Sequence, residues 1–118
     1  MEKIVERGLL YDFYGELLTE HQRSIYEASA FQDMSLSEIA QDFSISRQGV
    51  HDTLKRCDKI LTEYEEKLHL VEKFMKIQEN ARQINGILAE IKGTQERSEI
   101  LAKCDSIQLL AKDMIEEL

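Results

Sequence analysis

The sequence of 118 residues lacks proline and tryptophan and contains only two cysteines. Without proline, no interior position is barred from a helix. Cys57 and Cys104 stand 47 positions apart with no second cysteine near either, which favours reduced thiols over a disulfide framework or a zinc site. No apolar run approaches the ~20 residues that cross a bilayer, and the mixed charge of residues 1–7 predicts no secretory signal. We therefore expect a cytoplasmic protein without membrane insertion.

Motifs of catalysis and cofactor binding are also missing. The sequence contains no glycine-rich phosphate loop, no dinucleotide fingerprint and no nucleophile motif. Its three histidines, His21, His51 and His69, share no metal-ligand spacing. The sequence thus predicts a protein that is not an enzyme and that has no catalytic residues, no metal and no cofactor.

One short segment is basic within an acidic chain. The formal net charge is −8, which argues against non-specific coating of nucleic acid or of acidic membranes. Residues 44–60, however, carry four basic and two acidic side chains. A window of this kind arises readily by chance, and it is also what a local contact with phosphate requires.

Helical periodicity runs through nearly the whole chain, whereas strand alternation is absent, so we predict an all-α fold. The expected helices cover about residues 2–17, 20–31 and a short stretch after Ser35, then a long one from Arg47, one from Leu70 to Lys92, and a last one after Thr94. Gly93 is predicted to be the left-handed C-cap of the fifth helix, and Thr94 the N-cap of the last. Capping-box spacings at Thr19 and Ser35 open two of them. The first should bury a face of Leu10, Phe13, Tyr14, Leu17 and Leu18.

A change of hydrophobic phase near His69 divides the chain into two predicted domains. The apolar series from Val50 to Leu68 repeats every 3.5 residues on average, as in coiled coils, and a second series starts out of phase at Leu70. We expect a head of about four helices at 1–66 and a two-helix, coiled-coil-like tail at 67–118. The tail either folds back on itself and on the head or pairs two chains into a homodimer. We favour the homodimer because the last helix has apolar residues on more than one side.

Residues 36–55 fit the pattern of a helix-turn-helix. Ala40 supplies the small residue that a close helix crossing needs, and Ile39, Phe43 and Val50 belong to the apolar set around it. Ser44 stands in the turn, where a left-handed residue is usual, although a turn of this kind need not be left-handed.

The second helix of this motif carries the candidate DNA-binding residues. Ser46 as N-cap leaves free N–H groups near phosphate, and a helix at 47–59 would enter the major groove. Three side chains in its first turns could reach base edges: Arg47, Gln48 and His51. Three later cations are placed for phosphate: Lys55, Arg56 and Lys59. The competing interpretation is a solvated charged face that touches nothing.

The sequence resembles two known groups of proteins. Leu18-Thr19 with Gln22-Arg23, and Ile45-Ser46-Arg47 further on, are similar to region four of bacterial sigma factors. Over about residues 9–68 the chain is identified as a member of the YlxM-like family of small helix-turn-helix proteins, on residues 10–14, 46–48 and 54–56 among others.

This resemblance implies a bacterial cytosolic protein encoded beside signal-recognition-particle genes. It predicts a DNA-binding regulatory protein, with DNA, a second copy of the chain and signal-recognition-particle components as partners. The alternative is an accessory factor of that pathway that binds protein or RNA instead of DNA.

Overall fold

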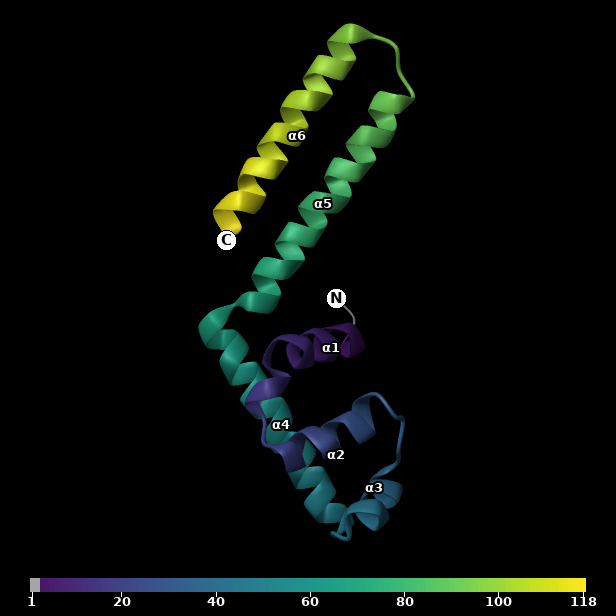
Figure 1. Ribbon diagram of the computed structural model, residues 1–118, viewed down its shortest axis with the longest axis vertical. Helices are drawn as coiled ribbons and strands as arrows, with labels where there is room; N and C mark the ends of the chain where they lie inside the picture. Colours follow the sequence, from purple (N-terminus) through teal and green to yellow (C-terminus); the bar gives the residue numbers. More distant parts are fainter. Residues whose placement is uncertain (1–2) are drawn as a thin grey trace. The chain divides into compact units, whose positions relative to one another are not determined.

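The computed structural model describes residues 3–118, and side chains from Val5 onward. In this range it contains six α-helices, one 3₁₀ turn and no strand, which confirms the all-α prediction (Figure 1). The elements are α1 Lys3–Tyr14, η1 Gly15–Leu17, α2 Glu20–Ala30, α3 Leu36–Phe43, α4 Arg47–Leu68, α5 Leu70–Lys92 and α6 Arg97–Glu117. The chain forms two compact units, one that ends at Val71 and one at Glu72–Leu118.

Helix α1 ends three residues earlier than predicted, and the chain tightens into η1 from Gly15. Gly15 lies against the ring of Tyr11, where a Cβ atom would come within 2.9 Å of the ring carbons, so this close approach requires glycine. The predicted start at Glu2 lies outside the described residues. The predicted apolar face is only partly correct, since Phe13 and Leu17 are 39% and 53% exposed. Its other three members, Leu10, Tyr14 and Leu18, are buried.

Two capping boxes start α2 and α3 as predicted. The Thr19 hydroxyl accepts from the Gln22 amide (3.2 Å), and the Gln22 side chain accepts from the Thr19 amide (3.0 Å). Ser35 and Glu38 make the same reciprocal pair at 3.1 and 3.2 Å. Each box satisfies two donors that a helix start leaves without intrahelical partners.

The turn between α3 and α4 is left-handed at Ser44, the conformation that is usual at this position of a helix-turn-helix. Ser44 has φ 56° and ψ 43°, and this conformation lets the Ile45 amide donate to the Ala40 carbonyl (3.0 Å). A non-glycine residue there costs on the order of 1 kcal/mol. The following Ser46 accepts from the Gly49 amide (2.9 Å) and caps α4 as predicted.

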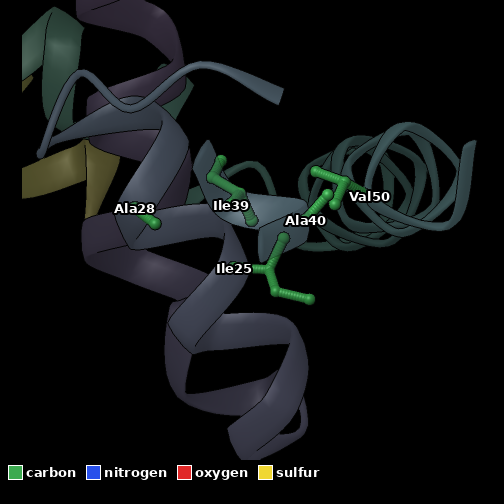
Figure 2. Close-up of a cluster of buried hydrophobic side chains, with 5 residues drawn as sticks. All are labelled: Ile25, Ala28, Ile39, Ala40 and Val50. Atoms are coloured by element: carbon green, nitrogen blue, oxygen red, sulfur yellow. The ribbon is translucent and has the colours of Figure 1, made fainter. Parts of the chain in front are cut away.

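The core of the head lies where α2, α3 and α4 meet. Ile25, Ala28, Ile39, Ala40 and Val50 form one buried cluster (Figure 2). Phe43, Ile45 and Leu54 pack against it. Figure 2 shows Ala40 beside Val50, which confirms the role of a small residue at the crossing of the two helices of the motif. This crossing determines which side of α4 is buried.

Helix α4 ends at His69, as the change of phase predicts, because this residue is left-handed (φ 56°). The start of α5 is tied to the head. The Tyr14 hydroxyl donates to Glu65 Oε1 (2.6 Å) and accepts from the Leu70 amide (3.1 Å). Glu65 Oε1 also accepts from the Val71 amide (3.0 Å). A buried tyrosine and a carboxylate of α4 thereby satisfy the first donors of α5.

The second unit is an antiparallel hairpin of α5 and α6 (Figure 1). Three contacts join its helices: Lys76 to Glu117 (3.5 Å), the Asn80 amide to the Leu110 carbonyl (3.4 Å), and Lys103 to Glu90 (2.7 Å). The predicted end at Lys92 is confirmed, but Gly93 is not left-handed.

Thr94 is not the N-cap of the last helix, contrary to the prediction. The Thr94 hydroxyl accepts from the Glu96 amide (3.3 Å) and donates to Glu99 (2.8 Å). Helix α6 therefore starts only at Arg97.

Candidate nucleic-acid interface

All seven residues predicted to bind DNA are on the exposed part of α4 or at its cap. They are Ser46, Arg47, Gln48, His51, Lys55, Arg56 and Lys59. The opposite side of α4 is the core side, where Val50, Cys57 and Leu61 are fully buried. At 100° per residue, Gln48, Lys55 and Lys59 point away from that side, and the other cations flank them. The fold thus leaves this face of the second motif helix exposed.

The cations of this face form no ion pairs in the part of the chain that the structure describes. Across residues 5–118, no carboxylate forms an ion pair with any of four side chains: Arg47, Lys55, Arg56 and Lys59. Asp58, one of the two acids in the basic segment, instead pairs with Arg7 of α1 (3.4 Å). Four positive charges therefore remain for an external anion, at separations that a helix fixes.

Asp52, the other acid, organises the two polar residues before it. Its Oδ1 atom accepts from Gln48 Nε2 (2.9 Å) and lies 3.6 Å from His51 Nδ1. The carboxylate thereby holds one amide donor and one ring nitrogen within the helix surface. The Gln48 side-chain oxygen remains available as an acceptor. When Gln48 Nε2 exchanges Asp52 for a base, both polar atoms of this side chain can bond the base edge.

Helix α2 contributes a surface that the sequence did not predict. Its first turn lies beside α4, and together they form a shallow hollow lined by Thr19, His21, Gln22, Asp52, Thr53 and Arg56. The positive end of the α2 dipole therefore opens next to the Arg56 guanidinium. The capping box at Thr19 marks this helix start in the sequence, but only the packing of α2 on α4 shows that it borders the basic face.

The described residues contain no group of three or more histidine, cysteine or acidic side chains arranged to hold a metal ion. Over the same residues, no helix has the length and hydropathy needed to span a bilayer. The two thiols are free, with Cys57 buried and Cys104 exposed. The polar face of α4 is thus the best-defined candidate site in the described part of the head.

Comparison with known proteins gives the same motif. The model of the UPF0122 family, "Putative helix-turn-helix protein, YlxM / p13 like", matches residues 1–103. A UPF0122 protein of Halalkalibacterium halodurans is 38% identical over 108 residues, which cover 92% of this chain and 99% of the relative. One from Clostridium kluyveri is 48% identical over 84 residues (71% and 76%), and one from Desulforamulus reducens is 51% identical over 74 residues (63% of each).

Proposed function

Because the chain belongs to the UPF0122 family of helix-turn-helix proteins, we propose that it is a DNA-binding regulatory protein of the bacterial cytoplasm and not an enzyme. Residues 47–59 of α4 enter the major groove. The observation that carries this proposal is the outer face of α4, with four cations that have no ion-pair partner among the described residues.

The residues of this face divide into two roles. Arg47, Gln48 and His51 belong to the first turns of α4, the part of a recognition helix that reads base edges. Arg and Gln offer the paired hydrogen bonds that guanine and adenine accept. Lys55, Arg56 and Lys59 follow one to three turns later and bind backbone phosphate, with Ser46 and the free amides of the α4 start.

The proposal is tested on the salt dependence of DNA affinity. We expect the double variant Lys55→Ala and Arg56→Ala to bind a labelled duplex of ~20 base pairs more weakly. Its slope of log affinity against log salt should fall by about 0.9 for each phosphate that the variant no longer neutralises. Fluorescence anisotropy at several salt concentrations measures both quantities.

A matched control separates a local contact from a change in total charge. Lys92→Ala with Lys112→Ala removes the same charge from exposed positions of the hairpin, and its slope should stay at the wild-type value. If the two double variants behave alike, or if neither changes the slope, α4 does not contact phosphate and the proposal fails.

An accessory role in the signal recognition particle pathway, through protein or RNA, is the second candidate. The observation that favours it is the net negative charge outside residues 44–60, which suits basic protein partners better than DNA. Capture of partners from a bacterial lysate, with and without a nuclease specific for DNA, distinguishes the two functions. Partners that all survive this nuclease contradict DNA binding, whereas loss of all of them contradicts a protein or RNA partner.

We also propose that two chains act together through their C-terminal helices. A single helix-turn-helix contacts too few bases for tight specific binding, and paired heads read two half-sites about one duplex turn (~34 Å) apart.

A further inference from the structure

The α5–α6 hairpin has two unlike sides. On one side, two ion pairs link the helices, Lys76 with Glu117 (3.5 Å) and Lys103 with Glu90 (2.7 Å). The residues of the other side, which we call the uncharged face, contain no charged side chain. They are Gln78, Ala81, Asn85 and Leu88 on α5, and Leu101, Cys104, Gln108, Ala111, Ile115 and Leu118 on α6 or at its end. In a chain with 32% charged residues, such a face marks a surface that is kept free of charge.

Both stripes of this face keep the spacing of a helix–helix contact. On α5 the successive intervals are three, four and three residues, and on α6 they are three, four, three, four and three. The same spacing leads on to Lys92 on α5 and back to Arg97 on α6, so the uncharged part of each stripe ends before the turn that joins the two helices. This 3.5-residue repeat is the period of knobs-into-holes packing. In each helix the stripe lies next to the residues that face the other helix of the hairpin. Because the helices are antiparallel, both stripes lie on the same side of the hairpin. The uncharged face is therefore one continuous surface of two helices.

The contacts within the hairpin set the level of each residue along this face. Asn80 is level with Leu110 (3.4 Å), and Glu90 is level with Lys103 (2.7 Å). By interpolation, Leu88 lies level with Cys104, Asn85 with Gln108, and Ala81 with Ala111. The face thus alternates apolar, amide and small layers, and an amide layer of this kind selects register in helical bundles.

Large apolar side chains of this face are exposed. Leu88 is 42% exposed, Leu101 53% and Ile115 70%, and no residue of α6 is buried. From the helix rise the face is about 15 Å long on α5 and about 25 Å long on α6, and two helices give it a width of about 20 Å, or about 400 Å² for each chain. Two such faces cover about 800 Å², the size of a small, reversible interface.

We propose that the uncharged face binds the same face of a second copy, so that two hairpins form a four-helix bundle. A face without charges has nothing to pair with a charged partner, whereas its 3.5-residue repeat, its small layer and its amide layer are complementary to themselves. This inference deepens the pairing part of the proposed function and names its surface. It does not depend on DNA binding.

The first test compares two substitutions in α6 that introduce the same charge. Ile115 belongs to the uncharged face, whereas Leu109, 65% exposed, points away from both α5 and that face. In sedimentation equilibrium at micromolar concentration, we expect the wild-type chain and Leu109→Lys at twice the 13.7 kDa of one chain. Ile115→Lys should sediment as a monomer with unchanged helicity by circular dichroism.

The outcome that overturns the proposal is a wild-type monomer with intact helices, or an Ile115→Lys dimer. The same experiment on Lys55→Ala with Arg56→Ala should give a dimer, so failure of pairing and failure of DNA binding are observed separately.

The second test uses Cys104, an exposed thiol within the face, while Cys57 is buried. In the wild-type chain, the rate of Cys104 alkylation by iodoacetamide should fall as protein concentration rises, because pairing covers it. In Ile115→Lys the rate should be independent of concentration. A concentration-independent rate in the wild-type chain contradicts the proposal.

Discussion

At the scale of single residues, the two cysteines show how burial determines the reactivity of a thiol. Cys57 is fully buried on the core side of α4, and this burial, with the nearby charge of Asp58, raises the pKa of its thiol from 9.0 to about 11. A thiol reacts as thiolate, so Cys57 is unreactive near neutral pH in the folded chain. Cys104 is exposed and is therefore the useful chemical probe of the hairpin.

The raised pKa of Cys57 predicts a loss of stability in alkali. The unfolded thiol ionises near pH 9.0, whereas the folded thiol keeps its proton until about 11. Its contribution is therefore complete below pH 9 and is lost as the pH rises between these values. We expect the free energy of unfolding, measured with urea, to fall by about 1 kcal/mol between pH 8 and pH 10.

Two variants check the assignment of this effect. Cys57→Ala should lose most of the slope below pH 9, where the tyrosines of the folded and of the unfolded chain keep their protons, whatever its effect on absolute stability. Above pH 9 the rings of Tyr11, Tyr14 and Tyr26, whose pKa values are also raised by burial, add to the loss. Cys104→Ala should keep the slope. An unchanged pH dependence in Cys57→Ala would assign the effect to other groups.

At the scale of elements, the helix starts are determined by pairs of residues three apart. Thr19 with Gln22 and Ser35 with Glu38 form complete capping boxes, and Ser46 caps α4 with its hydroxyl alone. These bonds lie within one turn of chain, so they form whatever the rest of the molecule does. They start the three helices that build the core of the head.

Removal of one cap should be measurable by itself. We expect Thr19→Ala and Ser35→Ala each to lower the free energy of unfolding by about 1 kcal/mol, read from urea denaturation. Ser37→Ala, an exposed change inside α3, removes a hydroxyl that caps nothing and should leave stability within about 0.5 kcal/mol. Equal losses in all three variants would mean that the caps do not determine these helix starts.

At the scale of the whole molecule, the chain contains a basic reading face in one unit and an uncharged face in the other. Each face is built from residues of its own unit, Arg47–Lys59 in the first and Gln78–Leu118 in the second. Pairing and DNA contact can therefore be changed separately. Pairing affects DNA contact only through the number of phosphates that one bound monomer or dimer contacts.

This separation predicts a particular DNA-binding behaviour for the pairing variant. Ile115→Lys keeps every residue of α4 but brings one head instead of two, so its salt slope on the duplex should be about half that of the wild-type chain. Leu109→Lys should show the full slope. Anisotropy at several salt concentrations measures it, and a full slope in a chain proven monomeric would show that one head makes all the contacts.

Much of the fold follows from residues close together in the sequence. The capping pairs, the small residue at Ala40 and the change of phase at His69 correctly predict the helix starts, the helix-turn-helix and the end of α4. Thr94 misleads the prediction because threonine caps helices often, and only its bond to Glu99 shows that it is engaged elsewhere. The end of α1 is predicted too late because the apolar spacing continues to Leu17 and Leu18, whereas the helix tightens into η1 from Gly15.

The sequence by itself determined the helices, the motif and the basic segment, because hydrogen bonds and periodicity over three to seven residues are local properties of the chain. Only the tertiary structure decided which charges stay available. Arg7 neutralises Asp58 from 51 positions away, and two ion pairs join α5 and α6 along one side of the hairpin. Such pairings depend on which distant residues folding brings together, and spacing along the chain does not contain that information.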